Sequence, residues 1–256
     1  MTWRRSFALL LPLLVFVGCG GSDERGTEVA GGRVLSPVKT IPRAESRESS
    51  HPRHPPDRPG QLTVQITRAT ALRSAPAGSV VARVSPKTAF RSDTILPVVA
   101  RRGGWLGVIS TQLPNGHVGW ISTSAALVAY RTHWSIAVSL SRREVVVRDE
   151  DRVAQRFRVA IGGPSTPTPT GRFAVTDKLL TQDPSSPYGC CILALSAHQP
   201  HTPQGWGGGD RIGIHATDLP ETIGSAASLG CLRAPAEEAR RLVRTVPLGT
   251  VVTIRA

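Results

Sequence analysis

The sequence predicts a mainly β protein: a small barrel, then a larger β-rich domain with one clear helix, behind a disordered N-terminal tether. Short alternating apolar runs, separated by Gly, Pro and Asn turn signals, recur from residue 61 onward. A helical pattern is convincing only over residues 236–245. Residues 20–60 are rich in Pro, Arg, Ser and Gly, so this stretch cannot bury enough apolar area to offset its ordering entropy.

The first 19 residues have the pattern of a targeting segment. Two arginines precede an apolar run over residues 7–17 that is too short to span a bilayer as a mature helix. The run ends at Cys19, followed by Gly, Gly and Ser, which resembles a bacterial lipobox. We therefore expect export, lipidation at Cys19 and a place on the outer face of a bacterial membrane, in the cell wall or in the periplasm. An ordinary secretory signal cleaved nearby is the alternative.

The tether over residues 20–60 would give a lipid-anchored protein reach above the membrane. The remaining cysteines are Cys190, Cys191 and Cys231. Adjacent cysteines pair only through a strained ring, so we expect no disulfide framework and a fold that rests on its hydrophobic cores.

The formal charge of +13 does not predict a nucleic-acid partner. Arginine outnumbers lysine 28 to 3, and the arginines are spread along the chain without a basic helix or aromatic interleaving. A weak affinity for anionic wall polymers or lipid headgroups fits this charge.

Residues 61–130 predict the small barrel, because closely spaced short strands occur there without a long helical pattern. The strands are expected at 62–66, 80–84, 95–99, 105–109 and 117–121. The stretch that begins at Trp105 and the Gly-Trp pair at Trp120 resemble bacterial Src-homology-3-like domains, in which these tryptophans are core or rim aromatics.

Residues 133–256 predict the second β-rich domain. Its strands are expected at 134–140, 144–148, 155–161, 173–176 and 250–254. The Gly- and Pro-rich segment 162–171 predicts a stiff, sharply bent loop. Pro235 suits the first position of the helix over 236–245, whose apolar side carries Leu242 and Val243.

One histidine and one cysteine in this domain predict a nucleophilic site. His215 ends the alternating run 211–215, and Cys231 lies in a small Ser-Leu-Gly-Cys turn. A thiol is a weak nucleophile at neutral pH until a base or a positive neighbour favours the thiolate, and a facing histidine supplies that base. The alternative is that Cys231 is a small buried hydrophobic residue.

These residues resemble the motif of the YkuD-type L,D-transpeptidases, His-Gly-Thr followed by Ser/Thr-His-Gly-Cys-Ile/Val-Arg. Here the chain reads His-Ala-Thr from His215 and Ser-Leu-Gly-Cys-Leu-Arg from Ser228, so Ala216 and Leu229 depart from the motif. The Pro-Thr-Pro-Thr-Gly-x-Phe string that ends at Phe173 and the turn at 139–143 also match the family. The resemblance covers residues 133–254.

The resemblance implies a bacterial cell-wall enzyme that crosslinks peptidoglycan stem peptides through a cysteine thioester, with no cofactor and no metal. Cys231 would be the nucleophile and His215 the general acid and base, with the N–H groups of Gly230 and Cys231 holding the oxyanion. Substrate contacts are expected from three further residues: Tyr188, Ser228 and Arg233. Arg233 could instead hold the turn.

Three other functions remain open from the sequence. Leu229 replaces a motif histidine, so the chain could be a catalytically weak or inactive wall-binding lipoprotein that retains stem peptides. Water as acceptor would make it an L,D-carboxypeptidase, and a cysteine amidase that attaches wall peptides to another protein is a third possibility. Cys190, Cys191, His198 and His201 could suggest zinc, but adjacent cysteines are poorly spaced ligands, and this segment matches a family loop without metal.

Overall fold

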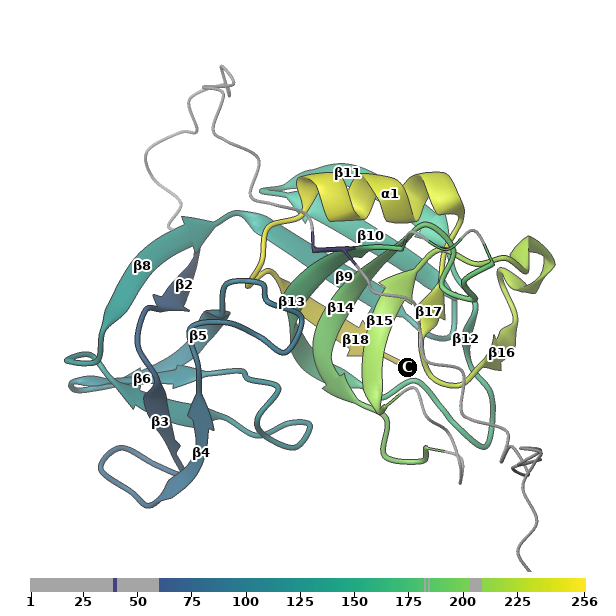
Figure 1. Cartoon of the computed structure of the whole chain (residues 1–256). Coiled ribbons are helices and arrows are strands. Elements are labelled where there is room, and N and C mark those ends of the chain that lie inside the picture. The colour runs from purple at the N-terminus through teal and green to yellow at the C-terminus, as the bar shows by residue number, and fades with distance from the viewer. Residues whose placement is uncertain (1–38, 41–59, 182, 184, 203–208) are drawn as a thin grey trace, which may run out of the picture. The chain divides into compact units, whose positions relative to one another are not determined.

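A computed structural model describes residues 39–40, 60–181, 183, 185–202 and 209–256, and it confirms the mainly β class (Figure 1). Helix α1 (Ala236–Thr245) is the one α-helix among these residues. None of the described helices is both long and apolar enough to cross a membrane. The predicted signal segment lies outside the described residues, as does the tether apart from residues 39–40 and 60.

The first of the two large sheets has seven strands in the order β4-β3-β7-β6-β5-β2-β8. Its strands are β2 (Gln61–Ile66), β3 (Thr70–Arg73), β4 (Val80–Val84), β5 (Ile95–Arg102), β6 (Trp105–Val108), β7 (Gly119–Ser122) and β8 (Leu127–Thr132). Buried aliphatic side chains from six of these strands form its core, among them Ile66, Leu72 and Ile121. The likeness to Src-homology-3-like domains stays a prediction.

The sequence missed β3 and β8 of this sheet. β8 pairs with β2 along its whole length, yet residues 128–131 are all exposed, so its side chains show no apolar-polar alternation. Trp120 is buried and the Arg102 guanidinium lies over its ring, whereas Trp105 is half-buried beneath Arg73. Both tryptophans are therefore core or rim aromatics, as predicted.

The second large sheet contains the order β11-β10-β9-β18-β13-β14-β15-β17, with β1 paired to β13. The strands are β1 (Lys39–Thr40), β9 (Trp134–Ser139), β10 (Glu144–Asp149), β11 (Arg152–Arg158), β13 (Gly171–Leu180), β14 (Cys191–His198), β15 (Arg211–His215), β17 (Leu232–Arg233) and β18 (Val251–Arg255). Short strands β12 (Ile161–Gly162) and β16 (Ala226–Ser228) form a separate parallel pair, and a 3-10 turn, η1, spans Pro220–Thr222.

Two strand pairings in this sheet are parallel, and one of them brings the strands beside His215 and Cys231 together. β18, the last strand of the chain, lies between β9 and β13 and runs parallel to β9. β17 runs parallel to β15, with His215 opposite Arg233, so Cys231 comes directly before a strand that adjoins the histidine's strand. The sheet therefore brings the two predicted chemical groups into one region.

Helix α1 packs on β14 and β15 through Ala239, Leu242 and Val243, all of them buried (Figure 1). The helix spans the predicted range 236–245. Pro235 is its N-cap residue and not the first helical residue, as the sequence had suggested. Glu237 and Glu238 in the first turn and Arg244 in the last complement the helix dipole.

The segment 191–198 is a strand, so its expected place in a loop is wrong. Nearly all of its residues are buried, because β14 lies between β13 and β15 and beneath α1. A strand whose residues are buried on both faces shows a continuous apolar run in place of alternation, and such a run does not by itself distinguish a strand from other buried segments. The strand expected at 155–161 is also displaced, since β11 spans 152–158.

Candidate active site

His215 ends β15 with only 3% of its surface exposed, and its backbone neighbours determine its tautomer. Its Nδ1 lies 2.5 Å from the carbonyl oxygen of Ala216. Because a carbonyl only accepts, Nδ1 must carry the hydrogen, which leaves the lone pair on Nε2. Burial lowers the pKa of His215 from 6.5 to about 4; the Ala216 hydrogen bond opposes this shift and the charge of Arg233 adds to it. At neutral pH the ring is an uncharged base.

Cys231 is partly exposed and has no disulfide partner. Its thiol makes a weak contact of 3.8 Å with the carbonyl oxygen of Arg211, and no hydrogen bond joins it to His215 among the described residues. Burial raises the pKa of the thiol, while a backbone hydrogen bond from Gly213 and the charge of Arg233 oppose that rise. The resting pair is therefore a neutral thiol and a neutral imidazole, not an ion pair.

Tyr188 lies beside both groups. Its ring meets the His215 ring edge-on, with 5.0 Å between centroids and an interplanar angle of 75°. Burial raises the pKa of the Tyr188 phenol, and the negative charge of a Cys231 thiolate raises it further. The structure thus brings together Tyr188, His215 and Cys231.

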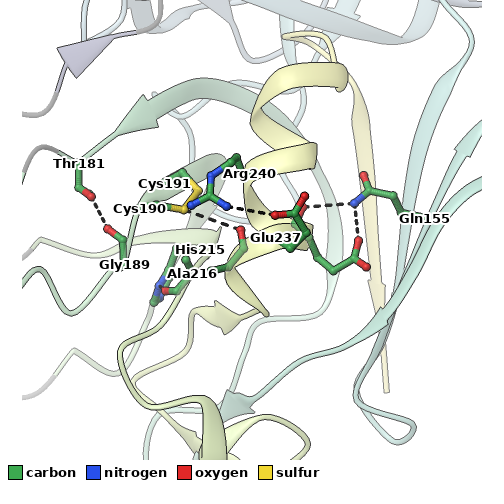
Figure 2. Close-up of a disulfide and its surroundings, with 11 residues drawn as sticks. Gln155, Thr181, Gly189, Cys190, Cys191, His215, Ala216, Glu237 and Arg240 are labelled. Carbon is green, nitrogen blue, oxygen red and sulfur yellow. Dashed lines mark hydrogen bonds and ion pairs between the residues drawn. A yellow bond between two sulfur atoms is a disulfide. The ribbon is translucent and has the colours of Figure 1, made fainter. Parts of the chain in front are cut away.

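Cys190 and Cys191 are joined to each other by a disulfide (Figure 2), a single bond between neighbours and not a disulfide framework. A bond between adjacent residues closes no chain loop, so it fixes only the local turn between Tyr188 and β14. The Cys191 carbonyl accepts a hydrogen bond from the Ala216 N–H, which connects this turn to the histidine strand.

Ala216, one of the departures from the family motif, fits into space that Gly189 leaves. Ala216 is fully buried, and a Cβ added at Gly189 would lie 2.6 Å from the Ala216 Cβ. Gly189 also has a φ of +58°, a conformation that favours glycine. A methyl group at 216 is therefore accommodated without displacing His215.

The nucleophile turn, residues 228–231, is closed by its own serine. Ser228 Oγ donates to the Cys231 carbonyl at 2.6 Å and accepts from the Gly230 N–H at 3.0 Å. The Gly230 N–H is thus engaged within the turn, whereas the Cys231 N–H has no acceptor among the described residues. Since Ser228 is buried and its hydroxyl is occupied, its predicted contact with substrate stays a prediction that this bonding does not favour.

The loop 162–168 and a buried glutamine hold the carbonyl groups of the nucleophile turn. The Ser228 carbonyl accepts from the Gly163 N–H at 2.9 Å and from Thr166 Oγ1 at 3.2 Å. The Gly230 carbonyl accepts from Thr168 Oγ1 at 2.8 Å, and the Leu229 carbonyl accepts from Gln199 Nε2 at 3.0 Å. The sequence predicted a stiff loop here, but not that Thr166, Thr168 and Gln199 donate to the turn.

The two remaining motif positions face different surroundings. The Leu229 side chain is 43% exposed, so it does not fill the interior of the site. Arg233 bonds through its backbone to Ala160, and no carboxylate pairs with its guanidinium in the part of the chain that the structure describes. Its contact with a substrate carboxylate and its structural role in the turn both stay predictions.

The lowered pKa of His215 predicts a stability that falls with acidity. Between pH 6.5 and 4 the unfolded chain protonates this histidine and the folded chain does not, so acid favours unfolding. We expect His215 to account for about 2 kcal/mol of stability lost between pH 7 and pH 5. Urea unfolding of the parent and of His215→Gln at both pH values measures this difference. Equal losses in the two proteins would contradict it.

The sequence profile of the YkuD L,D-transpeptidase catalytic domain matches residues 133–254. The protein YkuD of Bacillus subtilis (strain 168), assigned as an L,D-transpeptidase, is 33% identical over 125 residues, which cover 49% of this chain and 68% of that protein. YqjB of the same organism, assigned likewise, is 33% identical over 128 residues, covering 46% of this chain and 69% of YqjB.

Two solved structures are also similar. An L,D-transpeptidase from Mycobacterium smegmatis is 16% identical, with a TM-score of 0.42 over 75% of this chain and 99% of that one. The catalytic domain of the E. faecium L,D-transpeptidase acylated by ertapenem is 26% identical, with a TM-score of 0.38 over 49% of this chain and 99% of that domain.

Proposed function

Because the chain belongs to the YkuD family of L,D-transpeptidases, we propose that it crosslinks peptidoglycan stem peptides through a thioester on Cys231. One observation supports this function above the others. A buried histidine with an unprotonated Nε2 ends the strand that adjoins the cysteine's turn, which is the arrangement a thiol needs to become a nucleophile.

In the first half-reaction the Cys231 sulfur attacks the carbonyl carbon between the third stem residue and the terminal D-alanine. His215 Nε2 takes the thiol proton as the carbon–sulfur bond forms, so a stable thiolate is not required beforehand. The carbon–nitrogen bond then breaks, and the imidazolium returns the proton to the departing amine. Free D-alanine and a thioester remain.

In the second half-reaction an acceptor amine attacks the thioester carbonyl. Nε2 removes a proton from that amine, the carbon–sulfur bond breaks, and the proton returns to Cys231, which restores the starting enzyme. The oxyanion of each tetrahedral intermediate needs a preorganised donor. The Cys231 N–H is the donor that the nucleophile turn leaves unoccupied, since the Gly230 N–H is bonded to Ser228.

The contacts of Leu229 favour an active enzyme over a catalytically inactive wall-binding protein. The side chain at this position is exposed, and the backbone of the turn is held by Ser228, Thr166, Thr168 and Gln199. None of these bonds depends on the side chain at 229. A histidine is therefore not needed there to shape the turn.

Export and a lipid anchor at Cys19 complete the proposal and depend on the sequence alone, because that residue lies outside the described part of the chain. They would place the enzyme beside its polymer, on the outer face of a membrane.

The proposed mechanism predicts a covalent adduct with a carbapenem, a β-lactam class that acylates the family's cysteine. We expect intact-mass spectrometry of the full-length protein to show one added carbapenem, and the Cys231→Ala protein to show none. A tetrapeptide donor should then release D-alanine only with the parent protein.

Absence of an adduct on the folded parent would overturn the proposal as stated. The Leu229→His variant is the companion measurement. If it alone formed the adduct, the lost motif histidine would have silenced the site, and the wall-binding alternative would be correct.

A further inference from the structure

The side-chain amide of Gln199 joins the nucleophile turn to the loop 162–168. Gln199 is 6% exposed. Its Nε2 donates to the carbonyl oxygens of Leu229 at 3.0 Å and of Thr166 and Pro167 at 3.2 Å each. Because carbonyls only accept, the NH2 end of the amide must face them. One buried donor therefore holds two segments about 30 residues away along the chain.

Gly230 leaves the room in which this amide lies. Its φ is +118°, and a Cβ added there would overlap Gln199 Nε2 and lie 3.0 Å from Ile212 Cδ1. The glutamine amide thus packs directly against the backbone of the turn. The requirement for glycine before the nucleophile arises here from a neighbouring side chain as well as from the backbone conformation.

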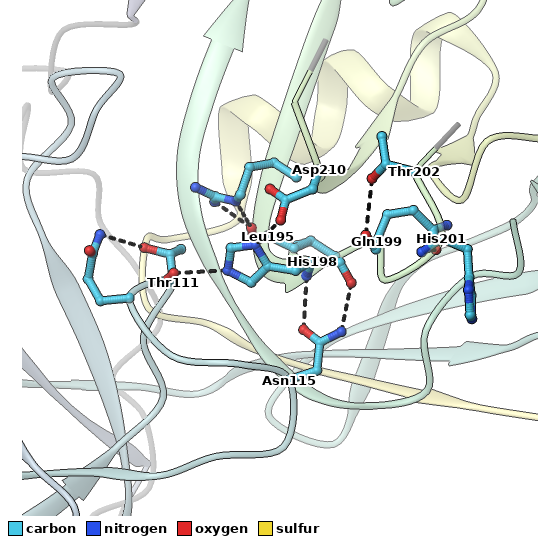
Figure 3. A network of polar contacts seen from close by, with 10 residues as sticks. Thr111, Asn115, Leu195, His198, Gln199, His201, Thr202 and Asp210 are labelled. Atoms are coloured by element: carbon cyan, nitrogen blue, oxygen red, sulfur yellow. Dashed lines mark hydrogen bonds and ion pairs between the residues drawn. The ribbon is translucent and has the colours of Figure 1, made fainter. Parts of the chain in front are cut away.

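The position of Gln199 is itself fixed at three points. Its N–H donates to the Asp210 carbonyl at 2.6 Å, and its Oε1 accepts from the His201 N–H at 3.1 Å. The preceding residue, His198, exchanges two backbone hydrogen bonds with the Asn115 side chain, at 2.7 and 2.9 Å (Figure 3). The segment that carries Gln199 is therefore attached to a loop of the seven-stranded sheet.

The His198 ring strengthens this attachment. One ring nitrogen lies 2.9 Å from the Thr111 carbonyl, and the other lies 2.8 Å from Asp210 Oδ2 (Figure 3). The ring therefore joins the same loop of the seven-stranded sheet to Asp210, whose backbone holds Gln199.

Because each peptide group is planar, the hydrogen bonds to the carbonyls of the nucleophile turn also orient its N–H groups. The carbonyl and the N–H of one peptide point in opposite directions, so a donor on the Leu229 carbonyl orients the Gly230 N–H toward Ser228 Oγ. In the same way, Thr168 on the Gly230 carbonyl orients the Cys231 N–H. Gln199 orients the 229–230 peptide. The 230–231 peptide follows it directly in the chain, so its position depends on the first.

We propose that Gln199 is a positioning residue for acyl transfer, which holds the 229–230 peptide so that the Cys231 N–H meets the oxyanion, and that Asn115 supports it through His198. The inference rests on the proposed function. Gln199 does not touch the reacting atoms. Its loss therefore slows the chemical step and leaves carbapenem binding nearly intact.

The test compares Gln199→Glu with the parent, both as full-length proteins, in carbapenem acylation. The substitution keeps size and shape but places a carboxylate oxygen against three carbonyls. We expect the acylation rate constant at saturating carbapenem to fall about 30-fold, with half-saturation changed less than about threefold. The rate should recover partly as the pH falls from 7 to 5, because a protonated Glu can donate to Leu229 again.

Gln155→Glu is the matched control. Gln155 is also buried, and its Nε2 donates to the backbone and side chain of Glu238, on α1 and away from the nucleophile turn. We expect this variant to lose thermal stability and to acylate at the parental rate. Asn115→Ala should lower the rate constant about fivefold, by loosening the segment at 198–199.

The outcomes distinguish a failure of the proposed function from a failure of the positioning role. If the parent forms no adduct, the proposed function fails. If the parent reacts and Gln199→Glu reacts equally fast, only the positioning role is wrong. A Gln199→Glu protein whose melting temperature falls while its folded fraction reacts at the parental rate would also overturn that role. An unchanged rate in Asn115→Ala would overturn the part assigned to Asn115.

Discussion

Replacing His215 with glutamine is expected to slow thioester formation by about 10³-fold, because general-base assistance contributes 10²- to 10⁴-fold in such reactions. Burial raises the pKa of the Cys231 thiol, so the thiolate is scarce at neutral pH without a base beside it. Glutamine has a comparable size and can donate to the Ala216 carbonyl as Nδ1 does, yet it cannot accept a proton. Rapid-mixing measurement of carbapenem acylation gives the ratio of the two acylation rate constants, parent to His215→Gln.

The pH dependence of the two proteins identifies the cause. The parental rate should stay level from pH 8 to about 5 and decline toward the His215 pKa of about 4. The His215→Gln rate should instead rise about tenfold per pH unit, because only a thiolate formed by bulk hydroxide then reacts. Parallel pH profiles would show that His215 is not the base that activates Cys231.

Replacing Gly162 with alanine is expected to destabilise the fold by about 3 kcal/mol or more, through a collision with backbone. A Cβ there would overlap the Thr166 carbonyl oxygen, and it would lie 2.5 Å from the Thr168 nitrogen and 2.8 Å from the Pro167 carbonyl carbon. Unlike the end of a flexible side chain, these atoms cannot move without shifting the loop. The Gly162 N–H also bonds to Thr168 Oγ1 at 2.9 Å, and Thr168 holds the Gly230 carbonyl.

Gly163→Ala is the control for this substitution. A Cβ at Gly163 would have its nearest neighbour, the Ala226 carbonyl oxygen, at 3.4 Å, which is an ordinary contact. Urea unfolding should show a change within about 1 kcal/mol for Gly163→Ala and the large loss for Gly162→Ala. Equal losses would mean that any side chain in this loop is harmful, whatever the space around it.

Local patterns in the sequence predicted the mainly β class, the helix at 236–245 and the region that holds His215 and Cys231. The helix has its own period and end signals, and the two site residues lie in a motif whose spacing can be read directly. Strand β14 and Gln199 could not be predicted in this way. β14 is buried along nearly its whole length, with α1 from later in the chain packed on it, and this burial removes the alternation by which strands are recognised.

The role of Gln199 in the site was not predicted because it also depends on contacts between residues distant in the sequence. Gln199 acts on carbonyls 30 and more residues away, and no residue type marks a main-chain acceptor. The Cys190–Cys191 disulfide was not predicted either, because adjacent cysteines in a sequence do not by themselves indicate a bond between them. Predictions from residue type alone are weakest where the partner is backbone.

The place of β18 imposes an order of assembly on the whole catalytic sheet. This strand, residues 251–255, pairs with β13 on one side and with β9 on the other, so it joins two groups of strands that no other ladder connects among the described residues. A chain that emerges from its N-terminus first can form β9–β11 and β13–β15 as separate ribbons, each with an edge of unpaired backbone N–H and C=O groups. β18, which follows the other strands of this sheet in the chain, then closes the sheet. Such long-range closure makes folding slow, and a partly emerged chain would be exposed to aggregation until β18 pairs with β9 and β13.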